Sequence, residues 1–176
     1  MISVLFVDVR GFTALAERLE PAAVAVELNR FYEIASRAIF LHDGTLDKLV
    51  GDQVMAFFGA PIERPDHAER AVKTVLEIFG EMSVGASDNL RLGAGVSTGE
   101  AFVGNVGGGE VTDYTVLGDM VNVAARLQGE AAAGEILLAK ETYARVAEQF
   151  PGAVRRELML KGKSEAVTAW KIVRTV

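Results

Sequence analysis

GTLDKLVGDQVMAFFG, residues 44–59, contains two apolar runs separated by the dipeptide Gly51–Asp52. Short apolar runs of this kind, joined by a tight turn, predict a β-hairpin. Lys48 and Asp52 interrupt the apolar pattern. Isolated charges among apolar residues are costly unless they are paired, lie at a rim or bind a ligand. The hairpin therefore indicates where to look for a functional site.

The chain on the N-terminal side of the hairpin predicts a strand followed by helices. The continuous apolar run at 2–9 is typical of a strand covered on both faces, and Gly11 ends it. Residues 12–42 are helical in pattern, with Pro21 placed to open a second helix.

After the hairpin, residues 66–82 predict an amphipathic helix capped by Asp66, with Glu69 at the capping-box position. The pattern beyond it predicts, in order, two long strands at 91–107 and 110–118 joined by a turn at Gly107–Gly109, a helix at 119–132, a short strand and helix, and a closing hairpin turned at Gly162. This order predicts an α+β fold with a ferredoxin-like (split βαβ) core and a C-terminal extension.

Composition sets limits on domain number and partners. A chain of 176 residues fits a single domain spanning 1–176. Its net charge of −6 argues against nucleic acid as a partner, and it contains no cysteine. No apolar run is long enough for a membrane span, and the N-terminus does not resemble a signal peptide. We expect a cytoplasmic domain. Because the chain begins at its first strand and shows no sensor domain, we also expect it to be part of a larger protein.

Two carboxylates are candidate metal ligands. Asp8 closes the first strand and Asp52 lies in the hairpin turn. In a ferredoxin-like core that strand lies beside the hairpin, so both side chains could share one edge. Carboxylates with neighbouring carbonyl oxygens suit Mg²⁺ or Mn²⁺, and such a pair can hold two ions for phosphoryl transfer. The alternative is an ordinary turn residue and an ordinary strand end.

Other polar residues are compatible with a nucleotide. The amides of Gly11, Phe12 and Thr13, between a strand and a helix start, could face phosphate, although an ordinary connection explains them too. Asn122 and Arg126 are four residues apart and share a helix face. An amide and a guanidinium side by side suit the sugar and the phosphate of a nucleotide. The alternative is an ordinary solvated helix face. Thr115 lies near the end of a predicted strand, and Lys161 and Lys163 flank a turn glycine.

Taken together, LFVDVRGFTAL, LDKLVGDQVMAFFGAP, YTVLGDMVNVAARL and LKGK resemble the catalytic domain of the class III nucleotidyl cyclases. The resemblance runs over essentially the whole chain. It implies conversion of a nucleoside triphosphate to a 3′,5′-cyclic monophosphate and pyrophosphate, with two Mg²⁺ or Mn²⁺ ions per site. It assigns metal binding to Asp8, Asp52 and the Val9 carbonyl, purine reading to Lys48 and Thr115, ribose orientation to Asn122, transition-state stabilisation to Arg126, and terminal-phosphate binding to Lys161.

The resemblance also implies a homodimer with two shared active sites. One protomer would supply the aspartates, and the other would supply the purine pair, Asn122 and Arg126. Lys48 and Asp52 would then serve different sites and would not be partners. The general base stays open between Asp8 and a water molecule.

The purine pair favours ATP. Adenine N1 is an acceptor and suits the Lys48 ammonium, whereas a Thr115 hydroxyl can accept or donate and so discriminates poorly. The pair resembles that of the IIIb subclass, which adds bicarbonate as a candidate activator. The alternatives are a guanylyl or promiscuous cyclase and a non-catalytic nucleotide-binding module. A diguanylate cyclase is disfavoured because VGDQV stands where a GGDEF-like hairpin would lie.

Overall fold

The computed structural model describes residues 1–84 and 90–173. Its strands are β1 (Ile2–Arg10), β2 (Thr45–Val50), β3 (Gln53–Phe58), β4 (Arg91–Gly99), β5 (Phe102–Gly108), β6 (Val111–Leu117), β7 (Glu135–Ala139), β8 (Val154–Leu158) and β9 (Val167–Val173). Its helices are α1 (Phe12–Ala16), α2 (Pro21–Leu41), α3 (His67–Ser83), α4 (Asp119–Glu130) and α5 (Lys140–Val146), with a 3-10 turn at Ala147–Gln149.

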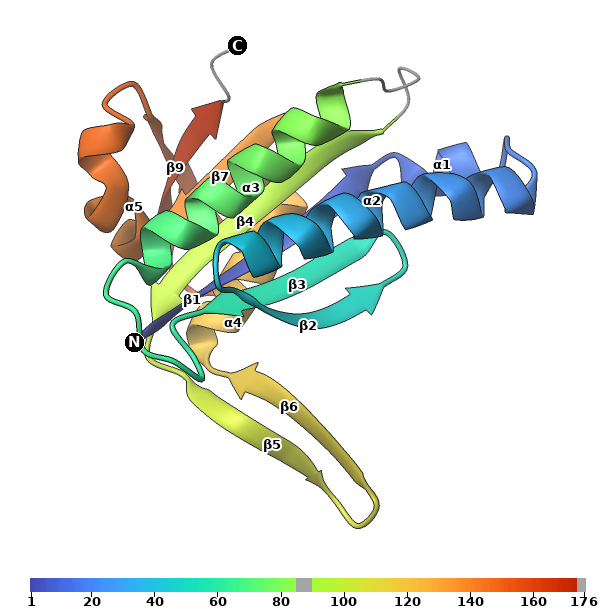
Figure 1. Ribbon diagram of the computed structural model, residues 1–176. Helices are drawn as coiled ribbons and strands as arrows, with labels where there is room; N and C mark the ends of the chain where they lie inside the picture. The colour runs from blue at the N-terminus through green and yellow to red at the C-terminus, as the bar shows by residue number, and fades with distance from the viewer. Residues whose placement is uncertain (85–89, 174–176) are drawn as a thin grey trace.

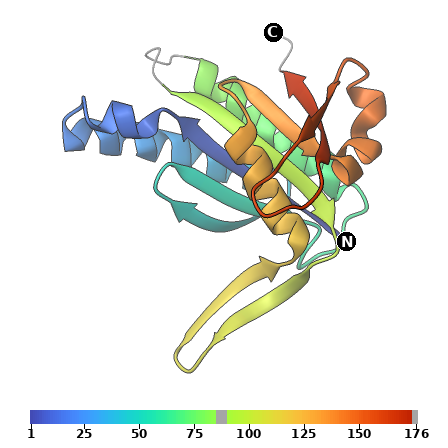
Figure 2. The ribbon, with the colours of Figure 1, turned by 180° about the vertical axis from the view of Figure 1, so that it is seen from behind.

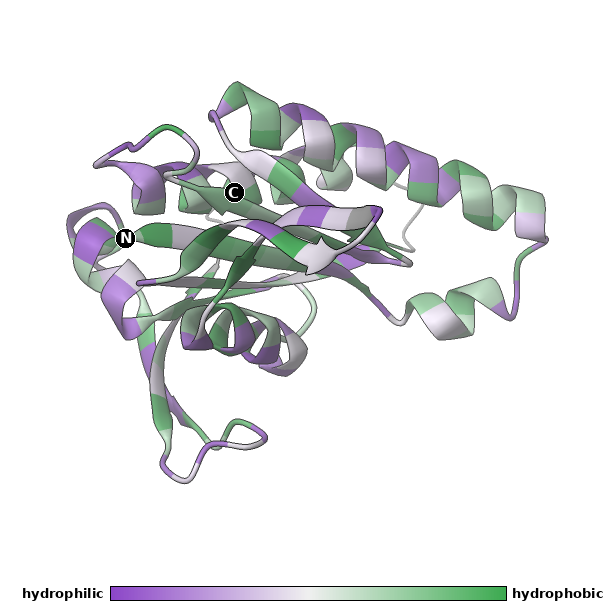
Figure 3. Ribbon diagram, turned by 90° about the horizontal axis from the view of Figure 1, so that it is seen from below, coloured by the Kyte–Doolittle hydropathy of each residue, from purple (hydrophilic) through white to green (hydrophobic). Residues whose placement is uncertain are grey.

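A sheet in the order β2-β3-β1-β4-β7-β9-β8 forms the centre of the molecule. Helices α2 and α3 cover one face and α4 covers the other (Figures 1 and 2). In the view from below, the hydrophobic residues, coloured green, concentrate in the strands between these helix layers (Figure 3). No helix of the described residues is both long and apolar enough to span a membrane.

The central strand β1 is buried on both faces, as its continuous apolar run predicts. Leu5 and Val7 belong to the core beneath α2 and α3. Val4 and Phe6 alternate with them and pack on the α4 side. A strand with two apolar faces needs helices on both sides of the sheet. Helices α2 and α3 cover one side, and α4 covers the other.

The core has the predicted ferredoxin-like arrangement. β1 lies between β3 and β4 and is antiparallel to both, and the β2–β3 hairpin turns at Gly51, whose φ is 59°. Strand β7 then adds to β4 in parallel, and β9 and β8 extend the sheet in antiparallel fashion. The α+β fold with a C-terminal extension is therefore confirmed.

One predicted strand is in fact two. The segment 91–107 breaks after Gly99 because Gly99 pairs with Ile2, the first residue of β1, and no partner strand continues beyond it. The chain leaves the main sheet there, and β5 pairs with β6 in a separate two-stranded sheet that projects away from the body (Figures 1 and 2).

The predicted capping box is also wrong in detail. Asp66 stands at the N-cap of α3, but its side chain makes no capping hydrogen bond. Its carboxylate instead accepts from Arg70 Nε at 2.8 Å, and Glu69 pairs with Lys73 at 2.6 Å. Both carboxylates are therefore satisfied by i,i+4 ion pairs along the helix.

Candidate active site

The two candidate metal ligands lie side by side. Asp8 is opposite Gln53 in the β1–β3 ladder, and the Val9 amide donates to the Asp52 carbonyl at 3.1 Å. The hairpin turn is therefore held against the end of β1. The Tyr32 hydroxyl of α2 donates to the Gly51 carbonyl from the other side and fixes the turn further.

The electrostatics of this pair favour a bound cation. Burial and, second to it, the neighbouring Asp52 carboxylate raise the pKa of Asp8 to about 6, although Arg10 and Gln128 act in the opposite direction. A partly buried carboxylate beside another carboxylate is held at a cost that a divalent ion would remove. These residues therefore fit Mg²⁺ or Mn²⁺. No group of three or more His, Cys, Asp or Glu side chains suited to a metal occurs within 1–84 and 90–173, so carbonyls, water or phosphates would complete the coordination.

Two residues that the sequence reading did not assign hold Asp8 in place. Gln128 Nε2 donates to Asp8 Oδ2 at 2.9 Å, and Arg10 Nη1 lies 3.3 Å from the same oxygen. Gln128 lies on the buried side of α4 and also accepts from Gln53 Nε2 at 3.1 Å. A glutamine among the apolar positions of that helix was the available signal.

A close approach between helix and sheet brings Gln128 to Asp8. A Cβ added at Gly95 of β4 would lie 2.3 Å from the Ala124 carbonyl oxygen and 2.4 Å from the Gln128 nitrogen. Only glycine leaves room there for the backbone of α4. The glycine-rich strand β4 therefore sets the position of Gln128 against the carboxylate pair.

The strand–helix connection after Asp8 borders a positively charged cavity. Gly11 has φ 73° and forms the N-cap of the short helix α1. A cavity of about 410 Å³ beside Gly11 is lined by Arg10, Gly11, Ala14, Leu15, Arg18, Arg91 and Ala133. Its three arginines make it suited to an anion. The sequence predicted the Gly11 region but not the arginines: Arg18 lies just after α1, and Arg91 comes from the distant strand β4.

The purine-reading candidates Lys48 and Thr115 are also brought together. Thr115 is buried on β6, and Lys48 lies on β2. Both contact the Asp47 carboxylate, and Lys48 also pairs with Asp113. These contacts raise the pKa of Lys48, with Asp113 as the largest cause. Lys48 has no ion pair with Asp52 among the described residues.

The remaining candidates lie on the outer side of α4 and on the loop that faces it. Asn122 is exposed and Arg126 is half-buried. A Cβ added at Gly162 would lie 3.3 Å from Arg126 Nη2, so the β8–β9 turn reaches this arginine. Lys163 Nζ binds both Asp119 carboxylate oxygens at 2.7 Å. Lys161 has no ion pair within the described part of the chain.

The candidates thus form three groups: the Asp8–Asp52 pair, the Lys48–Thr115 pair, and the α4 outer face with the β8–β9 turn. Within the described residues, no hydrogen bond or ion pair joins one group to another.

Comparison with known proteins identifies the family to which this arrangement of residues belongs. The family model described as the adenylate and guanylate cyclase catalytic domain matches residues 1–173. Adenylate cyclase 1 of Rhizobium meliloti is 34% identical over 135 residues, which are 73% of this chain and 20% of that protein. The chain thus spans about a fifth of that relative.

Solved structures give the same result. The adenylyl cyclase CyaB from P. aeruginosa superposes with a TM-score of 0.90 at 34% identity, covering 99% of this chain and 94% of that one. The guanylate cyclase domain of RhGC from Catenaria anguillulae, in complex with GTP, gives 0.88 at 26% identity, covering 99% and 97%. With its fold and almost its whole length matched, the chain belongs to the family of adenylate and guanylate cyclase catalytic domains.

Proposed function

We propose that this domain converts ATP to 3′,5′-cyclic AMP and pyrophosphate, at two equivalent sites shared between two copies of the chain. The observation that carries the reaction is the Asp8–Asp52 pair, in which the raised pKa of Asp8 indicates a position made for a divalent cation. Two Mg²⁺ or Mn²⁺ ions would be held by Asp8, Asp52 and the Val9 carbonyl. When bound, they would activate the ribose 3′-OH and offset phosphate charge.

The residues around the pair suit the triphosphate. The Gly11, Phe12 and Thr13 amides and the neighbouring arginines Arg10, Arg18 and Arg91 would face the phosphates, since their cavity adjoins Asp8. Lys161, which has no ion pair within the described residues, would hold the terminal phosphates from the second copy. Arg126 would lie against the α-phosphoryl group, where charge grows as the 3′-oxygen attacks and pyrophosphate leaves. Asn122 would orient the ribose.

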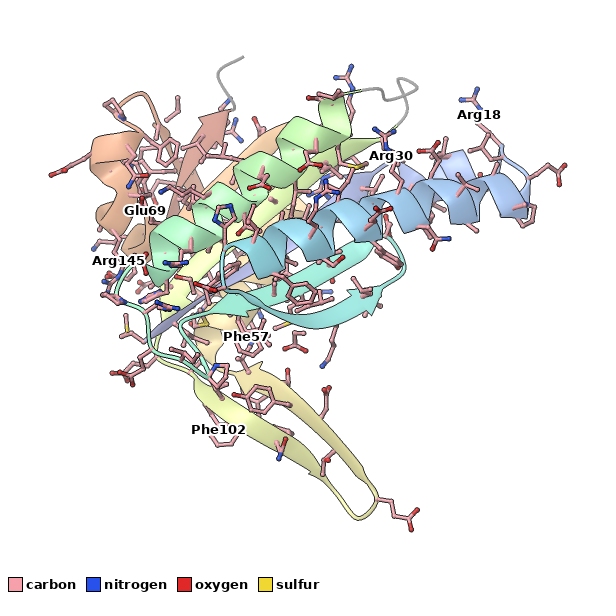
Figure 4. The ribbon with its side chains drawn as sticks, viewed as in Figure 1. Arg18, Arg30, Phe57, Glu69, Phe102 and Arg145 are labelled. Carbon is pink, nitrogen blue, oxygen red and sulfur yellow. The ribbon has the colours of Figure 1, made fainter. Side chains whose placement is uncertain are left out.

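The β5–β6 hairpin supports the dimer. Phe102 and Leu117 are directly opposite in the hairpin ladder and are 57% and 52% exposed. Figure 4 shows Phe102 on the projecting hairpin, whereas the labelled Phe57 belongs to β3 of the main sheet and is buried. Exposed apolar side chains on a projecting element are typical of an interface.

The direct test is to incubate the purified domain with Mn²⁺ and ATP or GTP and to measure the cyclic product. We expect cyclic AMP, a kcat/KM ratio that favours ATP, and loss of product in Asp52→Ala. Asp66→Ala is the matched control, because it removes a carboxylate paired with Arg70 at the start of α3. A ratio near one would contradict the adenylyl assignment. Nucleotide binding without any product would indicate a regulatory module, and added bicarbonate tests the subclass expectation.

A further inference from the structure

A buried carboxylate connects the two residues expected to read the purine. The Asp47 side chain has no exposed area. Its Oδ1 accepts from Lys48 Nζ at 2.7 Å, and its Oδ2 accepts from Thr115 Oγ1 at 2.6 Å. A buried charge is tolerated only where hydrogen-bond donors surround it, and the donors here are these two side chains.

A local irregularity of β2 builds this contact. The β2–β3 register shifts between Leu46, which is opposite Ala56, and Lys48, which is opposite Met55, so Asp47 is the extra residue of a bulge. Neighbouring residues of a regular strand point to opposite faces, and a bulge re-aims a side chain. The bulge therefore lets Asp47 contact both its own neighbour Lys48 and Thr115 on β6.

These bonds determine whether Thr115 and Lys48 donate or accept in the hydrogen bonds that they can still make to a ligand. An ionised carboxylate only accepts, so the single proton of the Thr115 hydroxyl is used by Asp47. The hydroxyl oxygen then has only lone pairs to offer a ligand. Lys48, whose pKa is raised by its carboxylate neighbours, remains an ammonium donor.

We propose that Asp47 is a positioning residue that makes the purine site selective for adenine, by holding Lys48 as a donor and Thr115 as an acceptor. This inference rests on the proposed function and deepens it. Adenine presents an N1 acceptor to Lys48 and an N6 amino donor to Thr115, so both contacts match. Guanine presents an N1–H donor and an O6 acceptor, so both contacts are mismatched. Thr115, which alone would discriminate poorly, becomes selective through Asp47.

The first test replaces Asp47 with its neutral isostere. In Asp47→Asn, the amide can donate to Thr115, which frees the hydroxyl proton to reach guanine O6. We expect the ratio of kcat/KM for ATP to that for GTP to fall by about tenfold or more, since mispaired polar groups dominate such selectivity. General damage to the fold would lower both values together and leave the ratio unchanged.

Asp113→Asn is the matched control. It also removes a carboxylate from Lys48 but leaves the bond from Thr115 to Asp47 intact. We expect its ATP-to-GTP ratio to stay within about twofold of the wild-type ratio, because the acceptor role of Thr115 is retained.

A second test uses the unmodified protein and so does not depend on the variant folding. 6-Methoxypurine riboside triphosphate keeps the N1 acceptor but offers only an acceptor oxygen at position 6. N6-methyl-ATP has similar size and keeps one N–H donor there. A hydroxyl held by Asp47 predicts that N6-methyl-ATP is the better substrate in kcat/KM by about tenfold.

The outcomes distinguish a failure of this inference from a failure of the proposed function on which it rests. A wild-type domain that prefers ATP, together with an unchanged ratio in Asp47→Asn, would overturn only the role of Asp47. Equal kcat/KM for the two analogues would do the same. A wild-type domain that makes no cyclic AMP would overturn the proposed function itself.

Discussion

The ionised Asp8 carboxylate is held in the fold at a cost in stability. Its side chain is 19% exposed, and burial together with the neighbouring Asp52 raises its pKa from 3.8 to about 6. The folded protein therefore favours the protonated carboxyl, and ionising it costs free energy. That cost is absent at low pH, appears as pH rises from about 4 to about 6, and persists above.

Replacing Asp8 with Asn removes this cost. At pH 8 without metal, we expect Asp8→Asn to raise the free energy of unfolding by about 1–2 kcal/mol, and the gain to vanish near pH 4. Urea unfolding in EDTA at both pH values measures the difference. Mn²⁺ should stabilise the wild-type protein and not the variant. Equal stability of the two proteins at pH 8 would show that the fold does not disfavour the Asp8 carboxylate.

The two lysines of the β8–β9 turn have different partners, so we expect different phenotypes. Lys163 binds Asp119, whereas Lys161 has no ion pair among the described residues. We expect Lys161→Ala to raise KM for ATP by about tenfold, the loss of one charge-assisted hydrogen bond to phosphate. Lys163→Ala is the matched control and should change KM less. Steady-state kinetics on both variants decides between the two lysines, and a larger effect at Lys163 would contradict the assignment.

At the scale of elements, local patterns predicted most of the structure. The buried run of β1, the hairpin turn at Gly51 and the proline that opens α2 are local signals, and all three are confirmed. The break after Gly99 was missed because it depends on where a partner strand begins. The bulge at Asp47 was missed because register is a property of two strands, and one strand's sequence does not contain it.

A buried chain of hydroxyl groups joins elements that are distant in sequence. Ser3 of β1 bonds His67 Nδ1 at 2.8 Å and Thr98 at 2.7 Å, and Thr98 bonds Thr142 of α5 at 3.0 Å. Burial lowers the pKa of His67. The network therefore ties α3 and α5 to the interior strands β1 and β4 of the central sheet, near the N-terminus.

Removing the Ser3 hydroxyl should destabilise the domain. Ser3→Ala removes the hydrogen bond to the buried His67 Nδ1 and leaves Thr98 with its bond to Thr142, so we expect a loss of about 1–3 kcal/mol in the free energy of unfolding. Ser36→Ala is the matched control, because the Ser36 hydroxyl bonds carbonyls of its own helix. Urea denaturation compares the two variants. An equal, small effect in both would mean that the Ser3 network contributes little.

At the scale of the whole molecule, motif positions could be predicted but their grouping could not. Asp8, Asp52 and Lys48 stand out in the sequence because they interrupt apolar runs. Gln128 and Asp47 also interrupt apolar patterns, but their roles depend on how α4 and the bulge of β2 pack in three dimensions, which the sequence pattern does not contain. The three groups of candidates also lack direct bonds to one another within the described residues, which is compatible with a site completed by a second copy.

Complementation between two inactive chains tests the shared site. Asp52→Ala removes a proposed metal ligand, and Arg126→Ala removes the proposed transition-state arginine. If one copy supplies the carboxylates and the other supplies the arginine, a mixed dimer has one site that carries both changes and one that is intact. Random mixing of equal amounts makes half of the dimers mixed, so activity should recover to about a quarter of the wild-type value.

The matched control mixes Asp52→Ala with Asp8→Ala, because both changes affect the carboxylate pair of one copy. Every site in that mixture lacks one carboxylate, so no recovery is expected. Product formation after subunit exchange, with heterodimers verified by mass spectrometry of differently tagged chains, supplies the measurement. Recovery in the control would mean that the two carboxylates act in separate sites. Verified Asp52→Ala/Arg126→Ala heterodimers without activity would place both residues in the site of a single copy, because only then does each copy carry a defect that its partner cannot complement.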